Sequence, residues 1–324
     1  MQVAVNGRVG SERKESLIGH SKEVILPLPT ECPHSFSQRT ASYRMESNAE
    51  LSDIAQMLWD NDVNRLQPGV DYKISLQEQT GQSYTDVNSK KAFPLFLFVN
   101  EDAFKKKTFS AFISLLDNYE ADTGQPEIIT AEEESEIHSF LDALMETTVL
   151  QIAHNYLLKK GRAKVNKEEF KLQLYDMWFR LYSREGSNQP NSSGFEHVFV
   201  GETRGGRMVI GFHNWIQFYL QEKLGHVDYK GYTMPDNQVK PDENKQLITL
   251  QFRWKKKVKL QGSCFLGVSP EFEFALYTII FLISPDRQLK LRFSQYEVII
   301  VCHSNKHKNI ETTYPVLLRY LTVN

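Results

Sequence analysis

A change of pattern at residues 183–194 constrains the fold of this 324-residue chain more than any other feature. Before this Gly-, Pro- and Ser-rich break, apolar residues recur at helical spacing, whereas after it they fall in short runs of strand length. The chain is therefore predicted to be an α+β protein. We expect a flexible tail at residues 1–46, a helical portion at 47–187 and a β-rich portion at 188–324.

Helix starts are marked by residues that cap helices. Ser47, Thr130 and Asn166 are each followed three positions later by Glu, the spacing of a capping box, and each pair precedes an amphipathic run. In the β-rich portion, Ser269 followed by Pro270 predicts a further helix, because Pro is favoured at the first helical position. A helix is also expected over residues 215–224.

Composition limits the class of protein. With 41% hydrophobic residues the chain can bury a substantial core, and a net charge of −2 argues against a globally basic binder. No apolar run is long enough for a membrane span and the first residues lack a signal-peptide core, so we expect an intracellular protein. A monomer is expected as well. Cys32, Cys264 and Cys302 are far apart and suggest neither disulfides nor a zinc site.

Two histidines stand at the edges of the stretch GFEHVFVGETRGGRMVIGFHNW, residues 194–215. Gly205 and Gly206 favour a tight turn, which predicts a β-hairpin with one strand starting at His197 and the other ending just before His213. Such a hairpin would bring two imidazoles together. The alternative is that both are ordinary polar residues at strand ends; their spacing fits no zinc motif.

A second basic feature follows in FRWKKKVKLQGSCFLG, residues 252–267, where four lysines occur within five positions. As a group they fit a solvated edge strand. Lys259 differs because it enters an apolar run and is expected to point toward the core. Two imidazoles can serve as base and acid at neutral pH, and a lysine can stabilise charge on phosphorus. This combination suits metal-independent RNA cleavage by the ribose 2′-hydroxyl.

Four motifs, GFEHVFVGE, GFHNWIQFY, VSPEFEFALYTIIFL and LWDNDVNRLQPGVDYKISLQ, resemble the poly(U)-specific endoribonuclease (EndoU) family over about residues 47–324. The resemblance implies a helical N-terminal portion and a β-rich catalytic portion. It implies that His197, His213 and Lys259 are catalytic. It also implies cleavage of single-stranded RNA 3′ of uridylates, leaving a 2′,3′-cyclic phosphate and a 5′-hydroxyl.

The resemblance places Thr312 and Tyr314 at the family's uracil-contacting pair, although Glu311 stands where family members have glycine. Trp254 and Lys257, in the lysine-rich stretch, are expected to bind substrate as well. The alternative function is an RNA-binding module with weak or absent cleavage, because lysines and aromatic residues would serve binding alone.

Manganese stimulation is implied by resemblance to animal members of the family, but the sequence shows no cluster of metal ligands. Glu196 and Glu202 flank the hairpin and could support the histidines or bind metal weakly. Glu271 and Glu273 are interpreted as structural acids in the first turn of a helix. Some family members are secreted, which leaves a secreted location as the alternative to an intracellular one.

Overall fold

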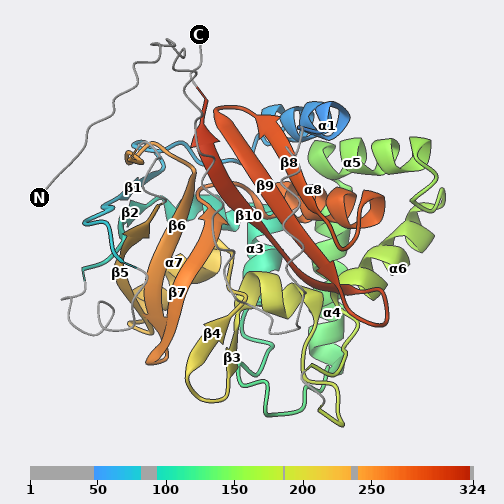
Figure 1. Ribbon diagram of the computed structural model, residues 1–324. Helices are drawn as coiled ribbons and strands as arrows, with labels where there is room; N and C mark the ends of the chain where they lie inside the picture. Colours follow the sequence, from blue (N-terminus) through green and yellow to red (C-terminus); the bar gives the residue numbers. More distant parts are fainter. Residues whose placement is uncertain (1–46, 82–92, 185–186, 235–239, 322–324) are drawn as a thin grey trace, which may run out of the picture. The chain divides into compact units, whose positions relative to one another are not determined.

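The computed structural model describes residues 47–81, 93–184, 187–234 and 240–321 (Figure 1). All of these residues belong to one unit, Glu31–Asn324. The predicted tail, residues 1–46, lies outside the described residues, and so does Cys32. Within the described ranges the elements are mixed helices and sheets, so the predicted α+β class is confirmed. The boundary between a helical and a β-rich portion at residue 187 stays a prediction.

The first part of the described chain is mainly helical. Its helices are α1 (Ala49–Asp60), α3 (Lys107–Ser114), α4 (Ala131–Met145), α5 (Thr148–Lys159) and α6 (Lys167–Trp178), with a 3₁₀ turn η1 (Glu101–Lys105). The predicted caps hold for α4 and α6, where Thr130 and Asn166 accept main-chain N–H groups of the first turn. Helix α1 is different, because Asn48 and not Ser47 caps it by accepting the N–H of Leu51.

A small sheet within the helical part was not predicted. Its strands are β1 (Tyr72–Ile74) and β2 (Phe96–Val99), which pair antiparallel. Both strands have only a few residues, and the exposed positions of β2 do not alternate with buried ones. Strands this short give too little periodicity to be recognised in a sequence.

The second part contains two sheets. The five-stranded sheet has the order β3-β4-β7-β6-β5 and the three-stranded sheet the order β10-β9-β8. All neighbours pair antiparallel except β4 and β7, which are parallel. The strands are β3 (Glu202–Arg204), β4 (Met208–Ile210), β5 (Val227–Thr233), β6 (Leu247–Trp254), β7 (Lys257–Phe265), β8 (Gln288–Phe293), β9 (Tyr296–Ser304) and β10 (Ile310–Tyr320).

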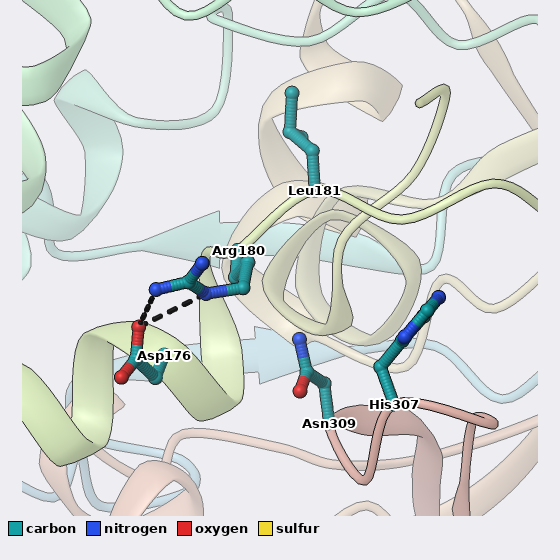
Figure 2. A pocket seen from close by; sticks show the side chains of 5 residues that line it. All are labelled: Asp176, Arg180, Leu181, His307 and Asn309. Atoms are coloured by element: carbon teal, nitrogen blue, oxygen red, sulfur yellow. Dashed lines mark hydrogen bonds and ion pairs between the residues drawn. The ribbon is translucent and has the colours of Figure 1, made fainter. Parts of the chain in front are cut away.

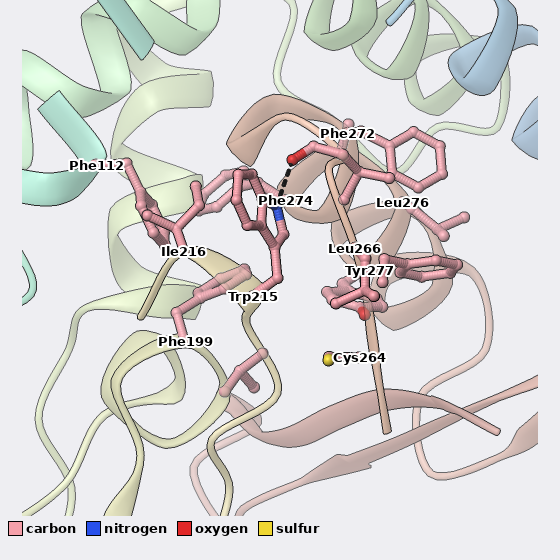
Figure 3. Close-up of a cluster of buried hydrophobic side chains, with 14 of the residues drawn as sticks. Phe112, Phe199, Trp215, Ile216, Cys264, Leu266, Phe272, Phe274, Leu276 and Tyr277 are labelled. Atoms are coloured by element: carbon pink, nitrogen blue, oxygen red, sulfur yellow. Dashed lines mark hydrogen bonds between the residues drawn. The ribbon is translucent and has the colours of Figure 1, made fainter. Parts of the chain in front are cut away.

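Helix α8 (Pro270–Ile283) is the centre of the hydrophobic core. Ser269 caps it and Pro270 occupies its first turn, as predicted. It is buried along almost its whole length and contacts α1, α3, α5 and β9. An apolar helix surrounded on all sides is typical of a protein core. Figure 3 shows aromatic and aliphatic side chains that pack around it, including Trp215 from the start of α7 (Trp215–Lys223). None of the described helices is long and apolar enough to cross a membrane.

The stretch Glu196–Val200 corrects the sequence prediction. It was expected to be the first strand of the hairpin, but it forms a π-helical turn in which the N–H of Gly201 donates to the carbonyl of Glu196 at 2.8 Å. All five residues are buried. Because a run that is buried on every side has no alternation, strand and helix cannot be told apart from its sequence. The hairpin is confined to β3 and β4, and Gly205 and Gly206 adopt the positive φ angles expected of its turn.

Trp178 joins the helical part to the core and provides a test of this packing. Its ring stacks on Phe274 with centroids 4.8 Å apart, and its Nε1 donates to Thr278 Oγ1 at 2.9 Å. We expect Trp178→Ala to lower the free energy of unfolding by about 3–5 kcal/mol, because it opens a cavity beside α8. Leu172→Ala, on the same helix at 58% exposure, is the control and should cost roughly 0.5 kcal/mol or less. Urea denaturation followed by circular dichroism measures both; equal losses would contradict the assignment of Trp178 to the core.

Candidate active site

His197 forms a buried ion pair. Its Nδ1 bonds to Oε2 of Glu202, the first residue of β3. The Nε of Arg184 lies 3.4 Å from the same oxygen. Burial works to raise the pKa of Glu202, but Arg184 and His197 together hold that pKa below its ordinary value. The carboxylate is therefore charged, and it stabilises the positive form of the His197 imidazole.

Arg184 links this ion pair to β10. Its Nε donates to Ser192 Oγ at 3.1 Å, and its Nη2 donates to the main-chain carbonyl of Glu311 at 3.0 Å and to the hydroxyl of Tyr182. Only 5% of Arg184 is exposed. Sequence reasoning missed this residue, because it stands in the polar break and its partners are distant in the chain. Glu311, the departure from the family pattern, is thereby a structural partner of Arg184.

Glu196 behaves differently from Glu202. Burial, and to a smaller extent the negative charge of Glu202, raises the pKa of Glu196 well above the ordinary value. Neither carboxyl oxygen of Glu196 has a hydrogen-bond partner within the described part of the chain. Burial therefore favours the neutral form of this side chain. Of the two acids flanking the hairpin, only Glu202 contacts a catalytic candidate directly.

His213 is held by the neighbouring strand. Its Nδ1 lies 2.9 Å from the main-chain carbonyl of Ser263 on β7. A carbonyl oxygen only accepts hydrogen bonds, so Nδ1 carries the proton and Nε2 is the basic nitrogen of the neutral ring. The ring also stacks on Tyr314 of β10, with centroids 4.6 Å apart and planes 9° from parallel. Orientation and tautomer of His213 are thus both fixed by its surroundings.

A close approach at Gly211 brings the two histidine segments together. The N–H of Phe212 donates to the carbonyl of His197 at 2.9 Å, and the N–H of His213 donates to the carbonyl of Val198 at 2.7 Å. Gly211 has a φ of +61°, and a Cβ atom at this position would lie 1.8 Å from the carbonyl oxygen of His197. Only glycine allows this contact. The main chains of the two histidine segments are thus joined through the π-helical turn and not through paired strands; convergence of the two imidazoles stays a prediction.

Lys259 lies on β7 and is 3% exposed. Its Cε would be 3.3 Å from a Cβ atom at Gly262, so the absence of a side chain there makes room for the lysine. Gly262 is followed directly by Ser263, whose carbonyl binds His213. The lysine side chain therefore runs along the strand toward the segment that holds His213. The inward orientation predicted from the sequence agrees with this burial.

The other residues of the lysine-rich stretch lie outside this arrangement. Lys255 and Lys256 are exposed in the turn between β6 and β7. Lys257 donates from Nζ to Thr203 Oγ1 at 2.8 Å. Trp254 is 1% exposed and packs edge-on against Phe212, with centroids 4.9 Å apart. The ring therefore supports the neighbour of His213, and substrate binding by Trp254 and Lys257 stays a prediction.

Thr312 and Tyr314 share one face of β10, because alternate residues of a strand point to the same side. Because the ring of Tyr314 stacks on His213, Thr312 lies on the same side of β10 as His213. Thr312 is 3% exposed, and its Oγ1 has no hydrogen-bond partner among the residues that the structure describes. A buried hydroxyl without a partner is suited to bind a polar ligand atom.

The fit of this site to manganese can be judged from its side chains. In the described ranges, no three His, Cys, Asp or Glu side chains converge as a cation site requires. Of the nearby acids, Glu196 has a raised pKa that disfavours its charged form, and Glu202 is engaged by Arg184 and His197. The described residues thus do not fit a cation held by protein ligands alone. Glu271 and Glu273 lie in the first turn of α8, as interpreted.

Comparisons with known proteins agree with this geometry. The model of the family described as Endoribonuclease XendoU matches residues 50–315. Uridylate-specific endoribonuclease B of Danio rerio is 59% identical over 280 residues, which cover 86% of this chain and 99% of the relative. Poly(U)-specific endoribonuclease-A of Xenopus laevis is 52% identical over 287 residues, 86% of this chain and 97% of the relative.

A solved structure supports the same conclusion. It is described as XendoU, a splicing-independent snoRNA-processing endoribonuclease, and is 52% identical in sequence. It superposes with a TM-score of 0.76 over 84% of this chain and 98% of the solved chain. The family match and these relatives span most of the chain. This chain, with its paired histidines and buried lysine, therefore belongs to the XendoU family of endoribonucleases.

Proposed function

We propose that this endoribonuclease cleaves single-stranded RNA on the 3′ side of uridylates by attack of the ribose 2′-hydroxyl on the adjacent phosphorus. The observation that carries the proposal is the complementary setting of the two histidines. His213 faces a carbonyl through Nδ1 and is basic at Nε2, whereas His197 faces a carboxylate that favours its protonated form. The names of the relatives support uridylate as the preferred nucleotide.

The reaction requires two proton transfers. Nε2 of His213 takes the proton of the 2′-hydroxyl as its oxygen attacks phosphorus. The bond from phosphorus to the 5′-oxygen then breaks, and this oxygen takes a proton from the His197 imidazolium. The products are a 2′,3′-cyclic phosphate and a 5′-hydroxyl. The ammonium group of Lys259 stabilises the negative charge that builds up on the phosphorane oxygens.

Recognition of uracil is assigned to β10. The Thr312 hydroxyl is buried and can donate to, or accept from, the polar edge of a pyrimidine. One face of Tyr314 is taken by His213, so this ring positions the base and the imidazole together. A site that hydrogen-bonds one base rejects another because unmatched polar groups are left buried without partners.

The alternative function is an RNA-binding module that cleaves weakly or not at all. It would need the positive groups but not their fixed protonation states. The ion pair of His197 with Glu202 and the carbonyl contact of His213 favour the enzyme, because binding of RNA gains nothing from a defined tautomer.

Manganese stimulation and an intracellular, monomeric state stay predictions. Neither of the two proton transfers depends on them.

The acid–base assignment predicts the effect of removing either imidazole. His197→Ala and His213→Ala should each lower the turnover number for a single-stranded oligonucleotide containing one uridine by about 10²–10⁴-fold. His138→Ala, an exposed histidine on α4, is the control and should keep full activity. Product ends are read by their cyclic phosphate, and folding by circular dichroism. Full turnover in either site variant with an intact fold would contradict the assignment.

The role of Glu202 predicts a change in the pH dependence of cleavage. A charged carboxylate favours the imidazolium of His197. In the neutral variant Glu202→Gln, this imidazolium should therefore lose its proton at a lower pH than in the wild type. The descending alkaline limb of the pH–rate profile should therefore move toward acid. Glu297→Gln is the control, because it removes another buried carboxylate. Burial works to raise the pKa of Glu297, but Arg292 and Arg319 keep it low. This control should leave the pH–rate profile unchanged. An unmoved alkaline limb in Glu202→Gln would show that Glu202 does not tune the acid.

Base selectivity is tested on neighbouring threonines. Thr312→Ala should relax the preference for uridine over cytidine more than it lowers total cleavage, because the lost hydroxyl is matched to one base. Thr313→Ala is the matched control, since this buried residue points to the opposite face of β10. Oligonucleotides that differ only at the scissile nucleotide give the ratio. If both variants kept the wild-type ratio, selectivity would lie elsewhere than in Thr312.

A further inference from the structure

A cavity of about 480 Å³ lies outside the catalytic arrangement. It is formed between the end of α6 and the turn that joins β9 to β10, and its volume is that of a small-molecule site. Figure 2 shows the side chains that line it, which are Asp176, Arg180, Leu181, His307 and Asn309.

The side-chain amide of Asn309 supplies a hydrogen-bond donor to this cavity. The residue is 8% exposed, and its Nδ2 has no hydrogen-bond partner among the described residues. Its main chain is fixed, because its N–H donates to Asn305 Oδ1 at 3.1 Å and its carbonyl accepts the N–H of Asn305 at 3.0 Å. A buried amide without a partner is costly unless a ligand accepts its hydrogen bond.

The remaining lining residues define the ligand chemistry. The Nε and Nη2 groups of Arg180 both donate hydrogen bonds to one carboxylate oxygen of Asp176. This contact raises the pKa of Arg180 further, so the guanidinium is always charged. His307, in the turn between β9 and β10, adds an imidazole to the lining. Leu181 supplies an apolar wall. Planar guanidinium and imidazole groups stack on bases, and positive charge attracts phosphate.

The cavity is connected to the catalytic residues through the chain. Asn309 directly precedes β10, three positions before Thr312. Leu181 is followed by Tyr182 and Arg184, which contact each other and the main chain of Glu311. The cavity is therefore adjacent in the chain both to Arg184 and to Thr312.

We propose that this cavity is a second nucleotide subsite, which binds an unpaired nucleotide of the RNA strand away from the scissile linkage. Arg180 and His307 contact its phosphate and base plane, and Asn309 donates to a base or phosphate oxygen. The proposal rests on the proposed function, because the nucleotide belongs to the strand that is cleaved. Its consequence is that a longer RNA gains affinity that a dinucleotide lacks.

Cleavage of two substrates tests the subsite. One is a dinucleotide of uridine and adenosine, and the other is a longer oligoadenylate with one internal uridine. Arg180→Gln, His307→Ala and Asn309→Ala should each raise KM for the longer substrate by about 10-fold, the loss expected for one nucleotide contact. The kcat for the longer substrate, and both constants for the dinucleotide, should stay at wild-type values. Lys306→Ala is the matched control, since it removes a charge from the same turn without lining the cavity.

Binding is measured separately on the His213→Ala background, with a fluorescent copy of the longer oligonucleotide that carries 2′-deoxyuridine. The three cavity substitutions should weaken this binding by the same factor. An equal rise of KM on both substrates, or an equal effect of Lys306→Ala, would overturn the subsite. Failure of the wild-type chain to cleave either substrate would instead overturn the proposed function, whereas the binding measurement would still report on the cavity.

Discussion

The carboxylate of Glu202 is the point on which the active site depends. A buried charge is tolerated only with partners, and Glu202 has two, Arg184 and His197. Through Arg184 the same network reaches Glu311 at the start of β10. One ionic cluster therefore fixes the π-helical turn, the β3–β4 hairpin and the last described strand relative to one another. Removal of any member would leave a charge uncompensated in the interior, so stability and catalysis are linked at this position.

The second histidine depends on the hydrophobic core. Asn214, directly after His213, caps α7, and its Nδ2 donates to Glu273 in the first turn of α8 at 2.8 Å. Burial raises the pKa of Glu273 to about 8, so this acid is mostly protonated at neutral pH. The loop that carries His213 is thus attached to α8, in the core of the described structure. His197 faces a charged carboxylate, whereas His213 faces a neutral carbonyl.

Local chemistry made much of this structure predictable. Thr130 and Ser269 mark helix starts because a cap involves residues within one turn, and Gly205 and Gly206 mark a hairpin turn because few other residues adopt their φ angles. The strand expected at His197 was wrong, since a fully buried run shows no period. Motif resemblance led to His197, His213 and Lys259, and all three are buried side chains of the described structure. Arg184 was missed because its partner Glu202 is far away in the sequence.

Strand β10 has a consequence for synthesis of the enzyme. It supplies the main-chain partner of Arg184, the buried hydroxyl of Thr312 and the ring that stacks on His213, and it is the last of the described elements. A ribosome makes this strand after every other described helix and strand, and domains fold as they emerge. A nascent chain therefore lacks a finished active site while most of its message is being read.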